Sequence, residues 1–382
     1  MSFARTAPTR THCGAPGVPR ADGSQEWSAG AGADPRTCVR SSNVTATSPP
    51  EGTPPENTRP DSTRSDGIVR RYRQLGDSGL TVSAVGLGCN NFGGRIDAGA
   101  SRAVVNACLD GGVTLFDTAD VYGGTPGRSE EILGQSLGTR RDDVVVATKF
   151  GADLRGANGP DWGVRGSRRY VRKAVEASLR RLGTDWIDLY QMHVPDAVTP
   201  IEETLAALHE LVVEGKVRYL GSSNFSAWQV VDADWAARTA GTTPFVSAQN
   251  EYSLLQRAVE AELVPACEHV GVGLLPYFPL ASGLLTGKYA RGVEAAPGTR
   301  LAGRPERLAA ADFDRIEALQ KYAEDRGVPL LNVAIGGLAA QPAVASVIAG
   351  ATSPEQVRAN VAAGAWEPSA EDLVALDEVA PA

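Results

Sequence analysis

The sequence predicts an α/β protein, a (β/α)8 barrel of the TIM type with an N-terminal β-hairpin and a disordered N-terminal tail. Short apolar runs rich in β-branched residues alternate with segments of helical periodicity, and eight such units in about 300 residues favour a closed parallel barrel. The expected strands cover 84–89, 114–117, 144–150, 187–193, 217–223, 245–250, 271–278 and 344–350. A doubly wound sheet is the alternative, but the glycine-rich fingerprint that usually follows its first strand is absent.

Helical segments separate most of these runs. Apolar residues that recur every three to four positions predict helices over 100–111, 128–137, 167–182, 201–214, 227–238, 257–269, 308–326 and 354–363. The stretch RQLGDSGLTVS at 73–83 predicts a β-hairpin before the first barrel strand, because a glycine-containing turn joins two strand-like segments. We expect this hairpin to close the bottom of the barrel.

The first 66 residues differ in composition from the rest of the chain. They contain no Leu, Ile or Lys, and their seven Arg balance seven Asp and Glu. Such a segment buries too little apolar surface to offset the entropy of ordering, so we expect a disordered tail over 1–68 and a single barrel domain over 69–382. A targeting peptide is disfavoured, because the segment lacks an apolar stretch and carries acidic residues throughout. A protein that begins near Val69 remains an alternative.

The overall composition limits the possible partners. A net charge of -8 argues against nucleic acid and anionic membranes as partners. No apolar run approaches the roughly 20 residues that a membrane span requires. The five cysteines are scattered without CxxC pairs, which is typical of a reduced cytoplasmic protein without disulfides or a zinc site. We therefore expect no metal.

Polar residues follow several of the expected strands, at the end of a barrel where active sites form. The second and third strands deliver Asp117 and Lys149, the fourth delivers His193, and Tyr122 lies in the loop after the second. Lys149 follows an apolar run, so it needs a partner, and Asp117 is the obvious one. Any one of these residues alone would more often be structural or solvated, but their joint occurrence on successive strands indicates a site.

The four residues suit proton transfer to a carbonyl oxygen. The ammonium of Lys149 is expected to lower the pKa of the Tyr122 phenol, and Asp117 would hold the ammonium in place. A neutral His193 could orient the carbonyl. The group contains no nucleophile and no metal ligands at usable spacing, so a bound hydride donor must supply the electrons.

Seven stretches, in this order along the chain, resemble the aldo-keto reductases. They are LFDTADVYGG, ATKF, LYQMH, GSSNFS, QNEYSLL, YFPLASGLLTGKY and GATSPEQVRAN, and the resemblance covers residues 72 to about 365. The resemblance implies a (β/α)8 barrel, NADPH bound without a Rossmann fold, and reduction of aldehydes or ketones to alcohols. It makes Tyr122 the general acid, tuned by Lys149 and Asp117, with His193 orienting the substrate.

The resemblance also assigns cofactor contacts. Ser223, Asn224 and Gln249 would hydrogen-bond the nicotinamide carboxamide, and Tyr277 would stack on its ring. The loop expected around the pyrophosphate comprises Phe278, Pro279, Leu280, Ser282, Gly283, Leu285 and Lys288. The adenine end would rest on Gly350, Thr352, Gln356 and Asn360, where Ser353, Pro354 and Gln356 form a helix-start signature and hence an anion site. Arg300 would contact the 2′-phosphate, which favours NADPH over NADH.

The expected substrate is a small-molecule carbonyl compound, in a pocket with Asn90, Phe92 and Trp162 among its walls. Two alternatives remain open at this point. One is a regulatory or redox-sensing subunit that binds NADP(H) and turns over slowly, since potassium-channel β subunits resemble the same family. The other is a sugar-nucleotide ketoreductase of secondary metabolism. The sequence does not indicate an oligomeric state.

Overall fold

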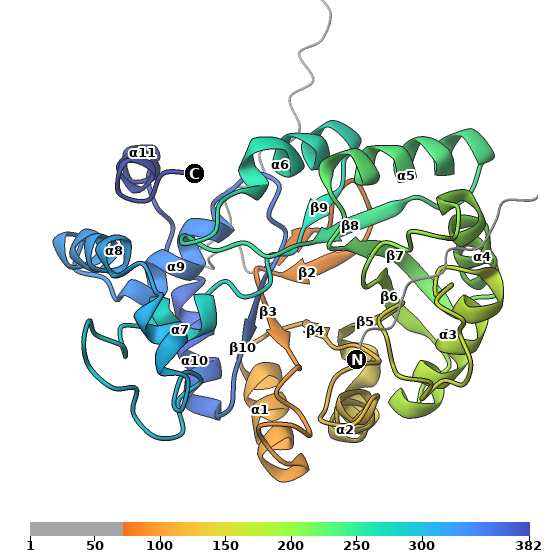
Figure 1. Cartoon of the computed structure of the whole chain (residues 1–382), viewed down its shortest axis with the longest axis horizontal. Helices are drawn as coiled ribbons and strands as arrows, with labels where there is room; N and C mark the ends of the chain where they lie inside the picture. Colours follow the sequence, from red (N-terminus) through yellow and green to blue (C-terminus); the bar gives the residue numbers. More distant parts are fainter. Residues whose placement is uncertain (1–71) are drawn as a thin grey trace, which may run out of the picture. The chain divides into compact units, whose positions relative to one another are not determined.

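The computed structural model describes residues 72–382. The tail expected over 1–68 lies outside the described residues. The described part contains a parallel eight-stranded sheet surrounded by helices (Figure 1). It also contains an antiparallel two-stranded hairpin, as the sequence predicts.

The eight parallel strands form a barrel. In the order in which they pair, they are β10 (Val347–Gly350), β3 (Val85–Gly88), β4 (Leu115–Asp117), β5 (Val145–Phe150), β6 (Ile187–Met192), β7 (Val217–Ser223), β8 (Phe245–Gln249) and β9 (Gly273–Leu274). Leu274 of β9 bridges Val344, just before β10, in parallel orientation. The Leu274 amide donates to Ala343 O at 2.7 Å, and the Ala345 amide donates to Leu274 O at 3.0 Å. These bonds join the two edge strands, and the predicted (β/α)8 fold is confirmed.

A ring of eight helices covers the outside of the barrel. They are α1 (Ala98–Asp110), α2 (Arg128–Leu137), α3 (Arg168–Leu182), α4 (Ile201–Val213), α5 (Ala227–Ala240), α6 (Val259–Val270), α9 (Leu330–Ala339) and α10 (Pro354–Ala363). Seven of them match predicted helices within a few residues.

The seventh helix of the ring differs from the sequence prediction. The predicted helix 308–326 corresponds to α7 (Pro305–Ala309) and α8 (Phe313–Asp325), and α8 packs on the outer side of α9 together with α11 (Ala370–Val379) (Figure 1). The ring position belongs to α9, which the sequence analysis missed. Eight of its ten residues are buried. A helix that is apolar on nearly every side lacks the amphipathic period used to recognise helices.

The hairpin β1 (Tyr72–Gln74) and β2 (Thr81–Ser83) closes the N-terminal end of the barrel. Its side chains Leu75, Leu80 and Val82 pack in one buried cluster with residues of the barrel strands, including Leu115 and Leu189. The turn requires a glycine: Gly76 has a φ of +58°, and a Cβ there would lie 2.5 Å from Gly271 O. Apolar side chains therefore fill the lower barrel.

Alternation along the strands places a polar layer above this apolar plug. Side chains two residues apart on a strand share a face. Asp117 follows Leu115 by two positions, and Gln191 follows Leu189 in the same way. Lys149 likewise follows Ala147, a third member of the apolar cluster. The C-terminal ends of the strands thus project polar groups into a barrel that is closed from below.

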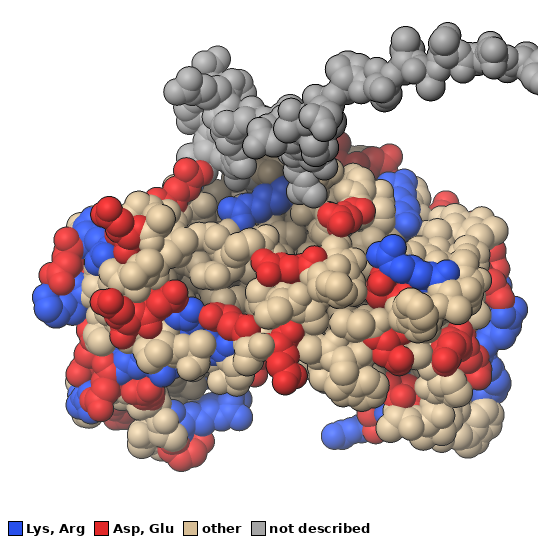
Figure 2. Space-filling view, turned by 90° about the horizontal axis from the view of Figure 1, so that it is seen from above, with Lys and Arg blue, Asp and Glu red and all other residues tan. Residues whose placement is uncertain are grey.

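Charged groups on the outer surface are mixed in sign. Figure 2 shows Asp and Glu side chains spread among Lys and Arg over one face, without a large continuous basic patch. In residues 72–382, no helix is long and apolar enough to cross a membrane.

Candidate active site

A buried ion pair lies at the centre of the site. Lys149 Nζ donates to Asp117 Oδ2 at 2.6 Å and to Thr118 O at 2.9 Å. Lys149 is 1% exposed and Asp117 is 3% exposed. Burial opposes the ammonium form of Lys149, but the charge of Asp117 and the nearby Tyr122 outweigh it, so the pKa of Lys149 is raised.

Two glutamines complete the surroundings of Asp117. Gln191 Nε2 and Gln249 Nε2 donate to Asp117 Oδ1 at 3.1 and 2.9 Å. Both glutamines are almost fully buried. Gln249 was predicted to bind a nicotinamide amide, and here it also supports the carboxylate. Gln191 was not predicted, because its role depends on a neighbour two strands away.

Tyr122 lies against Lys149 and His193. Lys149 Nζ is 5.1 Å from the centroid of the Tyr122 ring, and the Tyr122 and His193 rings meet edge to face at 5.7 Å. The sequence analysis expected Lys149 to lower the pKa of Tyr122, but in the structure this pKa is raised. Burial raises the pKa of Tyr122, and the opposing charge of Lys149 does not cancel this effect. The phenol therefore holds its proton at neutral pH, as a proton donor must.

His193 is neutral in this environment. Burial, and then the charge of Lys149, lowers its pKa to about 3. Its Nδ1 atom is buried and has no hydrogen-bond partner within residues 72–382. A neutral imidazole keeps one N–H group, which can donate a hydrogen bond to a carbonyl oxygen.

The residues predicted to bind a nicotinamide carboxamide lie on adjacent strand ends. Asn224, in the left-handed region at φ 60°, donates from Nδ2 to His193 O at 2.9 Å. The hydroxyl of Tyr277 donates to Asn224 Oδ1 at 2.8 Å. Ser223 Oγ donates to Gln249 O at 2.9 Å. This network fixes Asn224 and Tyr277 beside His193.

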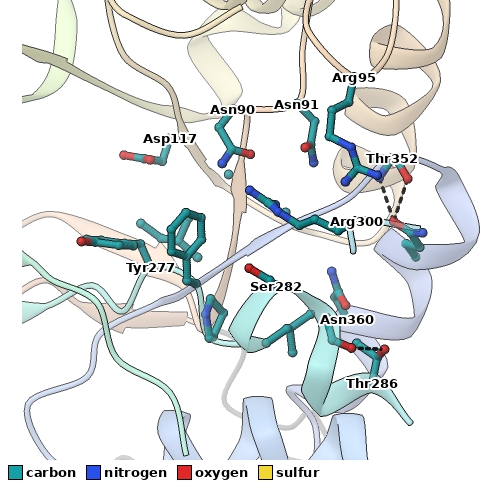
Figure 3. A pocket seen from close by; sticks show the side chains of 18 of the residues that line it. Asn90, Asn91, Arg95, Asp117, Tyr277, Ser282, Thr286, Arg300, Thr352 and Asn360 are labelled. Carbon is teal, nitrogen blue, oxygen red and sulfur yellow. Dashed lines mark hydrogen bonds between the residues drawn. The ribbon is translucent and has the colours of Figure 1, made fainter. Parts of the chain in front are cut away.

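These groups open into one elongated cavity of about 520 Å³ (Figure 3). This volume is in the range of small-molecule and cofactor sites. The residues from the predicted set that line it are Asn90, Asp117, Tyr122, His193, Ser223, Asn224, Gln249, Tyr277, Phe278, Pro279, Leu280, Ser282, Gly283, Lys288, Arg300, Gly350, Thr352, Gln356 and Asn360. Lys149 is buried behind these residues and does not itself line the cavity. Leu285 is 0% exposed and packs in the core, so it does not line the cavity as the sequence analysis expected.

The far end of the cavity favours an anion. Ser353 caps α10, its hydroxyl accepting from the Gln356 amide, and Thr352 N donates to Gln356 Oε1 at 2.8 Å. Arg95 and Arg300 reach this region from two different loops (Figure 3). Within residues 72–382, neither guanidinium forms an ion pair with a carboxylate. Burial, and then the charges of Arg95 and Arg304, lowers the pKa of Arg300. Unpaired cations beside a helix N-terminus form a suitable site for phosphate.

Arg95 was not predicted from the sequence. It lies in the loop after β3 and donates to Gly298 O at 3.3 Å, which ties this loop to the one that carries Arg300. Other lining residues missed are Gly88, Asn91, Thr286, Gly298, Leu331, Ile348 and Ala359. No local pattern identifies them, because each is brought to the cavity by the fold.

Two residues predicted to form walls of the substrate pocket do not line this cavity. Phe92 is 0% exposed and belongs to the core between barrel and helices. Trp162 is 70% exposed, does not line the cavity, and contacts the Arg169 guanidinium at 4.3 Å from its ring centroid. Its residue type suggested an aromatic wall, but residue type does not determine which way a loop folds. Asn90 alone of the three lines the cavity.

Comparison with known proteins agrees with this geometry. The family model described as "Aldo/keto reductase family" matches residues 84–381. A probable voltage-gated potassium channel subunit beta of Oryza sativa subsp. japonica is 39% identical over 306 residues, 77% of this chain and 90% of that protein. The uncharacterized oxidoreductase YrpG of Bacillus subtilis is 36% identical over 81% of this chain and 96% of its own. An L-glyceraldehyde 3-phosphate reductase of Escherichia coli O157:H7 is 34% identical over 81% and 92%.

The barrel, the polar residues at its strand ends and the elongated cavity define an oxidoreductase site. The chain belongs to the aldo/keto reductase family and is an NAD(P)H-dependent oxidoreductase. Its residues fit such a cofactor: amide side chains and a tyrosine lie at one end of the cavity, and at the other lie two arginines that form no ion pair with a carboxylate of residues 72–382. In residues 72–382, no group of three or more His, Cys, Asp or Glu side chains is placed to hold a metal ion.

Proposed function

We propose that this protein reduces the carbonyl group of a small aldehyde or ketone to an alcohol, with NADPH as the hydride donor and Tyr122 as the general acid. The observation that carries the proposal is the contact of a partly buried, protonated phenol with a neutral imidazole and a buried ammonium at one end of the cavity. NADPH supplies the hydride when it is bound.

The residues of the site divide the remaining tasks among them. His193 donates a hydrogen bond to the substrate oxygen and orients the carbonyl. The Tyr122 hydroxyl delivers the proton to that oxygen, and Lys149 stabilises the phenolate that results. Asp117 keeps Lys149 charged and in place, because the pair is only 2.6 Å apart. Ser223, Asn224 and Gln249 would hold the carboxamide, and Tyr277 would pack on the ring.

The preference for NADPH over NADH rests on the cations at the far end. Arg95 and Arg300 line the cavity without an acidic partner in the described residues, so a 2′-phosphate would supply the missing negative charge. Lys288 lines the same wall and adds a third positive charge. The three cysteines of the described part are free and buried, which supports a reducing, cytoplasmic setting.

A panel of carbonyl compounds tests this function. We expect the purified protein to oxidise NADPH when supplied with a reactive aromatic aldehyde, a small phosphorylated aldehyde or a sugar aldehyde, at rates that differ between them. A protein that binds NADPH one to one and turns over none of them would contradict the proposal. That result would instead favour the alternative of a regulatory subunit that binds NADP(H) and turns over slowly. The 39% identical rice relative is named as a probable channel subunit.

A further inference from the structure

Three side chains link the buried ion pair to the wall of the cavity. Asp117, Gln191 and Gln249 come from β4, β6 and β8, which are alternate strands of the barrel. Alternate strands of such a barrel contribute side chains to the same interior layer, so these residues meet although another strand lies between each pair. None of the three is more than 3% exposed. We call them the Asp117 triad.

The carboxylate of Asp117 fixes the direction of both amide groups. A carboxylate only accepts hydrogen bonds, so each amide must turn its NH2 group, and not its oxygen, towards Asp117. Oδ2 accepts from Lys149 Nζ at 2.6 Å, and Oδ1 accepts from Gln191 Nε2 at 3.1 Å and from Gln249 Nε2 at 2.9 Å. A flipped amide would place its oxygen against a buried negative charge, which is costly. The charge of Asp117 therefore determines the orientation.

Gln191 occupies the second N–H group of Gln249. Gln249 Nε2 also donates to Gln191 Oε1 at 3.3 Å, so both of its N–H groups are used inside the barrel. Gly221 on β7, the strand between them, leaves room for this contact, because a Cβ there would lie 3.0 Å from Gln191 Cγ. The remaining polar side-chain atom of Gln249 is Oε1, which accepts no hydrogen bond within residues 72–382. Since Gln249 lines the cavity, it can offer a ligand an acceptor but no donor.

The neighbouring polar groups are fixed as well. Asn224 Nδ2 donates to His193 O at 2.9 Å and to Ser223 Oγ at 3.2 Å, and Asn224 Oδ1 accepts from the Tyr277 hydroxyl at 2.8 Å. Ser223 Oγ uses its own proton on Gln249 O at 2.9 Å. The free capacity next to Gln249 therefore consists of oxygen lone pairs. Such a place suits a ligand group that carries N–H donors.

We propose that Gln191 is a positioning residue that keeps Gln249 Oε1 available to the cavity, so that the site selects a dinucleotide with a carboxamide NH2 group and rejects its nicotinic-acid counterpart. The inference rests on the proposed function, because it takes the nicotinamide end of the cofactor to lie beside Gln249. Gln191 does not itself line the cavity and acts through Gln249.

The two dinucleotides differ in one group. The carboxamide has two N–H donors and an acceptor oxygen, whereas the nicotinic-acid carboxylate carries a negative charge and only accepts. Opposite Gln249 Oε1 the carboxylate would meet another acceptor. The amide cannot flip to offer a donor, because Asp117 and Gln191 hold its NH2 group. We expect the wild type to bind NADP⁺ about 100-fold more tightly than nicotinic acid adenine dinucleotide phosphate.

Competitive displacement of bound NADPH, followed by its fluorescence, tests the inference without turnover. Gln191→Met keeps the length of the side chain and removes both of its hydrogen bonds, which releases the second N–H group of Gln249. This group can then meet a ligand acceptor, so the ratio of the two affinities should narrow by about tenfold. An unchanged ratio in Gln191→Met would overturn the proposal.

Ser247→Ala is the matched control. Ser247 lies two residues before Gln249 on β8, and its buried hydroxyl has no hydrogen-bond partner within residues 72–382. The control therefore alters the barrel interior without removing a contact of the Asp117 triad, and it should keep the wild-type ratio. Equal narrowing in Ser247→Ala and Gln191→Met would indicate a general disturbance of the barrel and contradict the role of Gln191.

A neutral analogue covers the case in which Gln191→Met does not fold. The 3-acetylpyridine analogue of NADP⁺ carries a methyl group in place of the NH2 group and has the same charge. The wild type should bind it about tenfold less tightly than NADP⁺, because Gln249 Oε1 loses its donor. An analogue that binds as tightly as NADP⁺ would overturn the proposed orientation of Gln249.

The outcomes separate this inference from the proposed function. A wild type that reduces aldehydes with NADPH but binds the carboxamide and nicotinic-acid dinucleotides equally would overturn the inference alone. A wild type that selects NADP⁺ through Gln191 but reduces no carbonyl compound would support the inference and contradict the proposed reductase activity.

Discussion

Lys149 Nζ lies 2.6 Å from Asp117 Oδ2, and both residues are almost completely buried at the C-terminal ends of β5 and β4. A buried pair of this kind contributes little net stability compared with apolar residues, but breaking it leaves one charge uncompensated. The pair therefore supports the site: it holds a permanent positive charge next to Tyr122 in a region from which water is largely excluded.

Breaking the pair should cost stability as well as activity. Lys149→Met leaves Asp117 with only the two glutamine donors, and we expect the free energy of unfolding to fall by about 3 kcal/mol. Urea unfolding measures this. The double variant with Asp117→Leu should recover most of the loss while remaining inactive. A single variant as stable as the wild type would contradict the account of the pair.

The depressed pKa of His193 predicts a pH-dependent contribution to stability. The unfolded state binds a proton near pH 6.5, whereas the folded state does so only near pH 3, so stability falls as the pH drops below 6.5. Between pH 7 and pH 5, His193 should account for about 2 kcal/mol of this loss. The difference in stability between wild type and His193→Gln, measured at several pH values, isolates the contribution. A difference independent of pH would show that His193 is not neutral and buried as described.

Arg300 should discriminate between the two nicotinamide cofactors. Because its guanidinium lacks an acidic partner in the described chain, Arg300→Met should weaken NADPH binding roughly 10- to 100-fold and leave NADH binding nearly unchanged. Equilibrium titration with each cofactor measures both. Arg304→Met is the matched control, because Arg304 acts on the charge of Arg300 without lining the cavity. An equal loss of affinity for NADPH and NADH would contradict this prediction, because Arg300 would then contact a part that both cofactors share.

Arg257 should anchor the C-terminal helix. It is 6% exposed and lies 2.6 Å from both Glu260 and Asp377, and it also donates to Ala380 O. Arg257→Met should lower the free energy of unfolding by about 3 kcal/mol and expose α11 to proteolysis. Lys321→Met, which removes an exposed pair with Asp325, should change stability by less than about 0.5 kcal/mol. Similar effects for the two variants would contradict the role of Arg257.

The sequence predicted those parts of the fold and site that depend on local pattern and barrel topology. Alternating strands and helices implied the barrel, and the barrel placed Asp117, Lys149 and His193 at one end. The helix Leu330–Ala339 was not predicted, because it is buried on almost every side and so lacks an amphipathic pattern. Arg95 and Gln191 were not predicted as site residues, because their contacts are with residues distant in sequence.

The errors have equally physical causes. Phe92 was expected in the substrate pocket because it follows the first barrel strand, and Trp162 because it is an aromatic residue in a glycine-rich loop. Packing places the first in the core and turns the second towards solvent. The pKa of Tyr122 was expected to fall beside a lysine. Its direction depends on the balance between burial and charge, and only the depth of the side chain in the structure settles that balance.

Comparison of the wild type with Tyr122→Phe, in NADPH oxidation with a reactive carbonyl substrate, tests the central claim most directly. The substitution removes only the hydroxyl, so NADPH affinity should change little while kcat falls by about 100-fold or more. Retained turnover in Tyr122→Phe, with unchanged cofactor binding, would contradict the assignment of Tyr122 as the proton donor.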